Sequence, residues 1–224
     1  MLKKLTMVIR SLKKMHLFFL LLILLICSSV FAATPDSIFS DNNRSVGIVT
    51  ALDAAGSPLR QGTGFIVSKD GAIVTNYHLI SDAKGIMVKV GDTVLKVEGV
   101  LSADRENDVV ILKAAGANLH PVKMGNTDRV TLGEQVYVMS STEGFGNLLG
   151  IGIVSGILQM NPSRKILQIA APLSEGSTGG PVFNKNGDFI GVVTFLIQGA
   201  KNLYFAVPAT FTKNTDTETK VMPL

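Results

Sequence analysis

Short β-prone segments separated by turn residues fill most of this chain, and this pattern restricts the fold more than any other feature. From about Ser45 onward, β-branched and aromatic residues gather in short runs, and no long apolar stripe follows the helical period. An all-β fold is therefore expected. The predicted strands cover residues 46–51, 63–68, 72–75, 85–90, 93–101 and 109–114 in a first group, and 135–139, 150–159, 166–171, 180–184, 189–197 and 203–207 in a second.

Each group of strands is small enough to close into a barrel. An Asp-Gly pair at 70–71 and an Asn-Gly pair at 186–187 favour tight hairpins, and the segment from His120 to Leu132 reads as a crossover between the groups. We expect two antiparallel six-stranded β-barrels, about residues 45–118 and 132–208, with the active site in the cleft between them. The polar tail, 209–224, is expected to hold a short helix or to be disordered.

The N-terminus has the pattern of a secretory signal peptide, residues 1–32. Basic residues precede an apolar stretch at 17–27, and the small residues that follow include the cleavage pattern Val30-Phe31-Ala32. The apolar stretch is shorter than the roughly 20 residues of a membrane-spanning helix, so cleavage is preferred and an uncleaved anchor is the alternative. The mature protein is therefore expected in the periplasm or outside the cell, with no stable membrane span.

The basic character of the sequence belongs to this segment. It holds five of the 21 Lys and Arg residues and none of the 17 Asp and Glu residues, which leaves 16 basic against 17 acidic residues. A near-neutral mature chain gives no support for nucleic-acid binding. It has no cysteine, no recognisable cluster of metal ligands and no phosphate-binding glycine loop, so we expect no disulfide, metal or cofactor. Nothing in the sequence specifies an oligomeric state.

A loop at residues 175–181 combines glycines, hydroxyl residues and a proline directly before an apolar strand. Its glycines permit unusual backbone angles, so the loop can expose the Thr178 hydroxyl and aim backbone N–H groups at one point. An acyl-transfer enzyme needs this combination for its nucleophile and oxyanion hole. On its own, a Gly-Gly-Pro segment is usually just a turn.

Only two histidines lie beyond residue 32, which shortens the search for a general base. His120, beside a proline in the crossover, is interpreted as a surface or core residue. His78 follows an apolar strand and is the candidate base. Such a base needs a carboxylate on its other ring nitrogen. Asp108, which opens the strand at 109–114, is the candidate, although it could also be a turn residue, and Asp104 competes for the role.

These segments resemble motifs of the trypsin-like, chymotrypsin-fold serine proteases, in particular bacterial peptidases of the HtrA (Do-like) type. The stretch Thr75-Asn76-Tyr77-His78-Leu79 is similar to the family's base segment, Asp108-Val109-Val110-Ile111-Leu112-Lys113 to its acid segment, and residues 175–181 to its Gly-x-Ser-Gly-Gly-Pro loop. The order His78, Asp108, Thr178 is that of the chymotrypsin type. The resemblance covers most of residues 45–208 and includes no PDZ domain.

The resemblance implies an exported endopeptidase for peptide or unfolded protein substrates, with His78, Asp108 and Thr178 as catalytic residues. It also implies an oxyanion hole from the backbone N–H groups of Gly176 and Thr178, and it places Thr194 on the substrate-binding strand. The segment around Leu173 has no carboxylate to receive a Lys or Arg side chain. Small or aliphatic residues are therefore expected before the cut bond.

Thr178 stands where the family has Ser, and its extra methyl restricts χ1. An ångström of misplacement can cost about a hundredfold in rate, so impairment is expected. Ser177 and Ser174 are weaker substitutes. Two functions stay open: an endopeptidase, favoured by His78 and Asp108, and a non-catalytic relative that binds peptides or a partner protein, favoured by Thr178. A plain binding barrel without protease ancestry would require three accidental motif matches.

Overall fold

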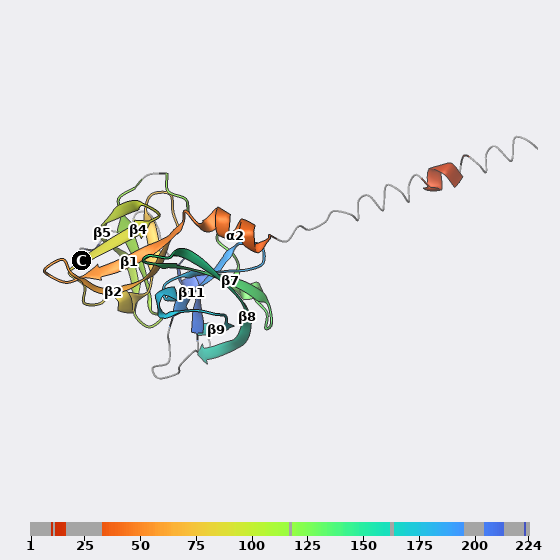
Figure 1. Cartoon of the computed structure of the whole chain (residues 1–224). Helices are drawn as coiled ribbons and strands as arrows, with labels where there is room; N and C mark the ends of the chain where they lie inside the picture. Colours follow the sequence, from red (N-terminus) through yellow and green to blue (C-terminus); the bar gives the residue numbers. More distant parts are fainter. Residues whose placement is uncertain are drawn as a thin grey trace, which may run out of the picture. The chain divides into compact units, whose positions relative to one another are not determined.

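Two closed antiparallel barrels, formed one after the other along the chain, make up the fold of the computed structural model (Figure 1). Barrel 1 has the strand order β1-β2-β3-β6-β5-β4, and barrel 2 has the order β10-β11-β12-β9-β8-β7. The prediction of an all-β fold with two six-stranded barrels is confirmed. The strands are β1 (Val46–Leu52), β2 (Pro58–Ile66), β3 (Ala72–Thr75), β4 (Gly85–Val90), β5 (Thr93–Asp104), β6 (Val109–Ala114), β7 (Gln135–Thr142), β8 (Gly146–Asn161), β9 (Arg164–Ala170), β10 (Pro181–Phe183), β11 (Phe189–Thr194) and β12 (Tyr204–Pro208).

The structure describes residues 10, 12–16, 33–116, 118–161, 164–194, 204–212 and 222. Ala33–Leu224 forms one compact unit, and Met1–Ala32 is a separate one. Most of the predicted signal peptide, and the part of the predicted substrate-binding strand beyond Thr194, lie outside the described residues. Within the described parts of the chain, no helix combines the length and apolar character that crossing a membrane requires.

Several strands extend beyond their predicted ends because a neighbouring strand, rather than an apolar pattern, supports them. β2 begins at Pro58 instead of residue 63, and its polar extension pairs with β1 through Ala51 and Arg60. β8 runs from residue 146 to 161 rather than 150 to 159, since its two ends pair with β7 and β9. Backbone hydrogen bonds to a partner strand therefore override weak local propensity here.

Among the described residues from Ala33 onward, the helices α2 and α3 were not predicted. The helix α2 (Pro35–Asn42) precedes barrel 1, and the Thr34 hydroxyl caps it by accepting a 3.2 Å hydrogen bond from the Ser37 N–H. A proline in its first turn fits a helix start. Ile38 buries one face of α2 in the core. The single turn α3 (Tyr77–Ile80) follows β3 directly.

The predicted hairpin turn between β2 and β3 has a specific steric requirement at Gly71. Its φ is +102°, and a Cβ atom there would lie 2.0 Å from the Ala114 carbonyl oxygen. Only glycine fits this position without displacing the end of β6. The turn delivers the chain into β3, whose residues Ala72–Thr75 are all buried.

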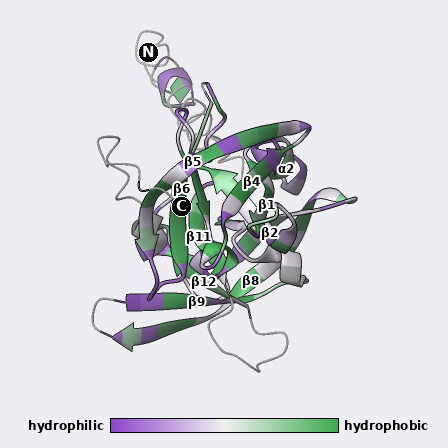
Figure 2. Ribbon diagram, turned by 90° about the vertical axis from the view of Figure 1, so that its left-hand side faces the viewer, coloured by the Kyte–Doolittle hydropathy of each residue, from purple (hydrophilic) through white to green (hydrophobic). Residues whose placement is uncertain are grey.

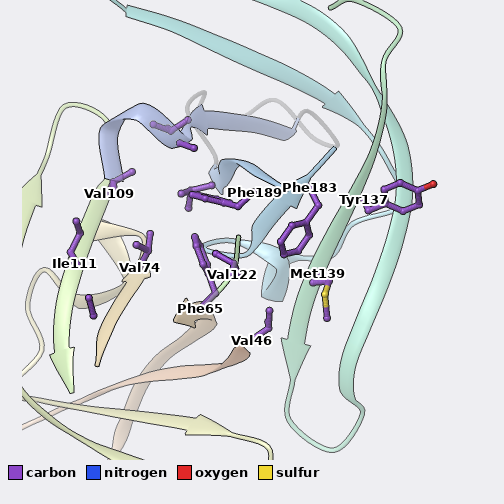
Figure 3. Close-up of a cluster of buried hydrophobic side chains, with 14 of the residues drawn as sticks. Val46, Phe65, Val74, Val109, Ile111, Val122, Tyr137, Met139, Phe183 and Phe189 are labelled. Atoms are coloured by element: carbon purple, nitrogen blue, oxygen red, sulfur yellow. The ribbon is translucent and has the colours of Figure 1, made fainter. Parts of the chain in front are cut away.

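Three apolar clusters hold the fold together. One fills barrel 1, one fills barrel 2, and a third is shared by the two barrels (Figure 3). In the shared cluster, Phe65 of β2 meets Phe189 of β11 with ring centroids 4.7 Å apart. The hydropathy colouring shows mostly hydrophobic residues along β6 and β11 (Figure 2). Since both barrels bury residues in one core, their inner ends are fixed against each other.

The predicted polar tail begins with a 3₁₀ turn, η3 (Ala209–Thr212). Further along, Met222 forms an isolated antiparallel bridge with Val100 of β5, with both backbone N–H···O distances at 2.9 Å. This described residue of the tail therefore lies against barrel 1.

Candidate active site

His78 lies on the one-turn helix α3, just after β3 ends at Thr75. Leu79 and Ile80 on the same turn are buried and anchor it in the core of barrel 1. The His78 side chain remains 43% exposed. An apolar strand and a short anchored helix thus present an imidazole to solvent at a fixed position. His120, which the sequence suggests is a surface or core residue, is an exposed residue of the connection between the barrels.

Asp108 contacts both the side chain and the backbone of His78. Its Oδ2 lies 2.7 Å from His78 Nδ1, and its Oδ1 accepts a 2.9 Å hydrogen bond from the His78 N–H. The pairing requires a proton on Nδ1, so a neutral ring carries its free lone pair on Nε2. The ring is therefore fixed in both tautomer and orientation, as a general base requires.

Backbone contacts hold Asp108 in an unusual conformation. Its φ is +54°, which is uncommon for a non-glycine residue. The Asp108 carbonyl accepts from Asn76 Nδ2 at 2.9 Å and from the Tyr77 N–H at 3.2 Å. Asp104 has a different task, since its two carboxylate oxygens accept from the N–H and Nδ2 of Asn107 at 2.9 and 2.6 Å. Asp104 therefore caps the turn that leads to Asp108.

The Thr194 hydroxyl donates a 2.6 Å hydrogen bond to Asp108 Oδ2. Thr194 is buried at the end of β11, so this bond reaches from barrel 2 to the acid of barrel 1. From the sequence, Thr194 is expected on the substrate-binding strand, and this contact with Asp108 is not foreseen. One signal was present: a hydroxyl in the apolar segment Phe189–Thr194 needs a buried partner.

Thr178 lies in a loop clamped between the two barrels. Its side chain is buried, with the residue 3% exposed, and its carbonyl accepts a 2.8 Å bond from the Thr63 N–H. The next residue, Gly179, has φ +80° and donates its N–H to the Val193 carbonyl at 2.9 Å. A Cβ on Gly179 would lie 2.1 Å from the Thr63 carbonyl oxygen and 2.6 Å from Thr75 Oγ1. The loop backbone thus packs against the strand end that leads to His78.

Thr63 of β2 is the centre of this clamp and was not identified from the sequence. Its hydroxyl donates to the Gly176 carbonyl at 2.6 Å and accepts from the Ser141 N–H at 3.0 Å. Its carbonyl accepts from Thr75 Oγ1 at 2.7 Å. One buried residue of barrel 1 therefore fixes the loop at residues 175–181, β7 and β3 together.

The predicted oxyanion donors, Gly176 and Thr178, flank Ser177 in and after the 3₁₀ turn η2 (Glu175–Ser177). The Ser177 N–H donates to the Ser174 carbonyl at 2.9 Å, and its hydroxyl accepts from the Ser174 N–H at 3.2 Å. Ser177 is therefore used within its own loop. An oxyanion hole needs the N–H groups of Gly176 and Thr178 to converge on one point, and this role stays a prediction.

Leu173 lies on the barrel 2 side of the loop, where a substrate side chain is expected. It is partly buried against the barrel 2 cluster, and its carbonyl accepts a 2.6 Å bond from Tyr204 Oη. Gly150 of β8 faces it, since a Cβ there would lie 3.2 Å from Leu173 Cδ2. The surroundings of Leu173 are therefore apolar and closely packed.

A pocket of about 390 Å³ lies between barrel 1 and the turn that joins β7 to β8. Gln61 and Glu143 face each other there, with Nε2 and Oε2 2.9 Å apart. Thr142 lines the same pocket and lies close to Gly176 of the loop at residues 175–181. The pocket therefore adjoins that loop.

In the described part of the chain, no group of three or more His, Cys, Asp or Glu side chains is placed to hold a metal ion.

An ion pair lies at the carboxyl end of the helical turn that carries His78. Arg60 pairs with Asp82 and donates its Nε–H to the Leu79 carbonyl at 3.3 Å. Hydrogen bonds from the Arg60 guanidinium hold the pKa of Asp82 below its ordinary value. Because Asp82 is exposed, the pair orients the turn more than it stabilises the fold.

Comparison with known proteins agrees with this geometry. Residues 62–192 match a family described as a trypsin-like peptidase domain. The chain is 35% identical over 153 residues to a probable periplasmic serine endoprotease, DegP-like, of Pseudomonas fulva, covering 66% of this chain and 32% of that protein. It is 32% identical over 166 residues to a putative serine protease, HhoB, of Synechocystis sp., covering 70% of this chain and 40% of that protein.

The chain thus spans about a third of the length of the curated relatives it matches. Among solved structures, the serine endoprotease from Yersinia pestis superposes with a TM-score of 0.69 at 25% sequence identity. The match covers 80% of this chain and 64% of that one.

Proposed function

The chain belongs to the trypsin-like peptidase family, and from this premise we propose that it hydrolyses peptide bonds through His78, Asp108 and Thr178. The observation that carries the proposal is the Asp108–His78 contact of 2.7 Å, reinforced by the Thr194 hydroxyl on the same carboxylate oxygen. A protein that only binds has no chemical need for an imidazole oriented in this way.

In the proposed reaction, Nε2 of His78 accepts the Thr178 hydroxyl proton while Oγ1 forms a bond to the substrate carbonyl carbon. The N–H groups of Gly176 and Thr178 stabilise the oxyanion. Nε2 then gives its proton to the substrate amide nitrogen as the C–N bond breaks, which leaves an ester on Thr178. Water, deprotonated by the same nitrogen, hydrolyses the ester and restores the hydroxyl. Asp108 stays ionised and stabilises the imidazolium form of His78.

The methyl group of Thr178 sets the expected rate. Because the residue is buried and β-branched, the rotamer that aims Oγ1 at His78 must also fit the methyl group into a crowded turn. The proposed enzyme is therefore slow, and its Thr178→Ser variant is faster by on the order of a hundredfold.

Peptides or unfolded proteins outside the cytoplasm are the proposed substrates. The signal-peptide pattern of residues 1–32 and the word periplasmic in the name of the Pseudomonas fulva relative support export. The apolar packing around Leu173 supports a small or aliphatic residue before the cut bond. A peptide library cut chiefly after Lys or Arg would contradict this specificity.

A second candidate function is peptide or partner-protein binding without catalysis. Thr178 favours it, since this residue stands where the family has its serine nucleophile. In that case the same cleft binds a peptide that the protein does not cut. The two functions differ in one observable, covalent chemistry at residue 178.

A paired assay separates them. The mature protein and its Thr178→Ser variant are incubated with unfolded protein and with a fluorophosphonate probe. Turnover in both, abolished by His78→Ala, supports the enzyme. Turnover in the serine variant alone supports a triad silenced by one methyl group. If neither folded protein is labelled or active, the catalytic proposal is wrong.

A further inference from the structure

Arg164, the first residue of β9, reaches across from barrel 2 to the turn that precedes Asp108. Its Nη2 donates a 2.6 Å hydrogen bond to the Glu106 backbone carbonyl, and its Nη1 lies 3.4 Å from Glu106 Oε1. The Arg164 side chain is 13% exposed, whereas that of Glu106 is 70% exposed. An exposed carboxylate at 3.4 Å contributes little. The short bond to the backbone carbonyl is therefore the contact that matters.

The placement of this arginine is unusual for a surface hairpin. Burying a guanidinium is unfavourable unless its N–H groups find acceptors. The Nε of Arg164 is buried and has no acceptor among the described residues, so its hydrogen bonds rest on the two Nη contacts with Glu106. The Arg164 side chain thus makes its hydrogen bonds to the turn before Asp108.

That turn needs external support. Asp108 adopts φ +54°, a conformation that is sparsely populated unless surrounding contacts enforce it. The start of the turn is held by Asp104, which accepts from Asn107. Its end is held by the side-chain amide of Asn76 and the backbone N–H of Tyr77, which both donate to the Asp108 carbonyl. The Glu106 carbonyl lies between these two points, and Arg164 holds it.

We infer that Arg164 is a positioning residue for the catalytic acid. By fixing the Glu106 carbonyl, it sets the backbone that presents the Asp108 carboxylate to His78. Its catalytic consequence rests on the proposed function, while its effect on the Asp108–His78 contact does not. Thr194 donates a hydrogen bond to the Asp108 carboxylate itself, and Arg164 donates one to the backbone carbonyl two residues earlier. Barrel 2 therefore orients the acid of barrel 1 at two points.

Proton NMR tests the geometric part without any turnover. It uses residues 33–224, which form a compact unit of their own, with native Thr178. The measured signals are the downfield Nδ1 proton of His78 and the exchange rates of the Tyr77 and His78 amides, which donate to Asp108. Arg164→Ala is expected to shift or broaden the Nδ1 signal and to speed exchange of both amides about tenfold. Arg164→Lys, which restores one donor, is expected to recover part of both changes.

Two control variants isolate the carbonyl contact. Lys165→Ala changes the neighbouring residue of β9, whose ammonium contacts the Thr127 carbonyl and Asp128 instead of this turn. Glu106→Ala removes the exposed carboxylate but keeps the backbone carbonyl. Both are expected to leave the His78 signals unchanged. If Arg164→Ala does not fold, Arg164→Gln, which keeps much of the buried stem, replaces it.

The kinetic arm uses whichever of the native and Thr178→Ser proteins turns over. Arg164→Ala is expected to lower kcat about tenfold with little change in KM, because it displaces the acid and not the substrate. Unchanged NMR signals and unchanged kcat in a folded Arg164 variant would overturn the inference. Altered NMR signals in a protein without turnover would uphold the positioning role and count against the proposed function alone.

Discussion

Asp108 Oδ2 accepts two hydrogen bonds from opposite barrels, one from His78 Nδ1 at 2.7 Å and one from Thr194 Oγ1 at 2.6 Å. The acid is thus shared between the two halves of the fold. Its position depends on how the barrels are joined as well as on its own loop.

Thr194→Val tests this link because valine keeps the shape of threonine and removes the hydroxyl. A buried hydrogen bond to a charged group contributes about 2 kcal/mol, so urea unfolding should show a loss of that order. In the catalytically active background, kcat should fall roughly tenfold as Asp108 loses one of its supports. Thr194→Ser keeps the hydroxyl and should retain most of both. Equal losses in the two variants would count against the hydrogen bond as the cause, because the serine variant keeps the hydroxyl.

Gly179→Ala should destabilise the protein more than a positive φ alone explains. The new Cβ would lie 2.1 Å from the Thr63 carbonyl, in addition to the strain of φ +80°. Gly144 is the matched control, because its φ is +83° and a Cβ there meets nothing within 4 Å. Gly144→Ala should cost about 1 kcal/mol in urea unfolding, and Gly179→Ala at least about 3 kcal/mol. Similar costs would show that the loop can move away from β2.

Asp70 should give a small pH dependence of stability. A hydrogen bond from Ser68 and then one from Lys113 lower its pKa from the usual 3.8. The native state therefore binds the proton less readily than the unfolded chain. Its stabilisation is complete above the unfolded pKa and is lost as the pH falls through the folded pKa.

Asp70→Asn removes this contribution. Urea unfolding should find the variant less stable at neutral pH by under about 1 kcal/mol, since the carboxylate is largely exposed. The difference from the native chain should shrink as the pH drops below about 4. A difference that stays constant over this range would assign the loss to another cause.

Phe65→Ala should remove a main contact of the core shared by the barrels. Phe65 is fully buried and packs on Phe189, so the expected cost in free energy of unfolding is about 3–5 kcal/mol. Phe145, at the turn between β7 and β8, is 79% exposed and serves as the aromatic control. Phe145→Ala should change stability by no more than about 0.5 kcal/mol. A mild effect of Phe65→Ala would indicate that the barrels hold together without this aromatic contact.

The sequence was sufficient for the architecture because short runs of β-branched and aromatic residues, separated by turn residues, mark the strands independently of the rest of the chain. The Asp-Gly pair before β3 and the Asn-Gly pair before β11 are local signals, and both lie at hairpins of the structure. The polar start of β2 carries no such signal, since its pairing with β1 supplies the hydrogen bonds. The short helix α3 was also missed, because four residues are too few to show a helical period.

For the candidate site, the sequence identified residues that stand inside recognisable motifs. It did not identify the residues that hold them. The contacts of Thr63 with Gly176, of Arg164 with Glu106 and of Thr194 with Asp108 join residues that lie 113, 58 and 86 positions apart. Such contacts depend on how the two closed barrels pack against each other, and no local sequence pattern predicts that packing.

The Thr63 clamp has a consequence for building hybrid proteins. A chimera whose amino-terminal barrel comes from a protein that lacks this threonine would lose a side chain that contacts both Gly176 and Ser141. The transplanted half could fold and still leave the loop at residues 175–181 of the recipient unsupported. Interchangeable halves in this architecture must therefore be matched at that threonine first, before any residue that touches substrate.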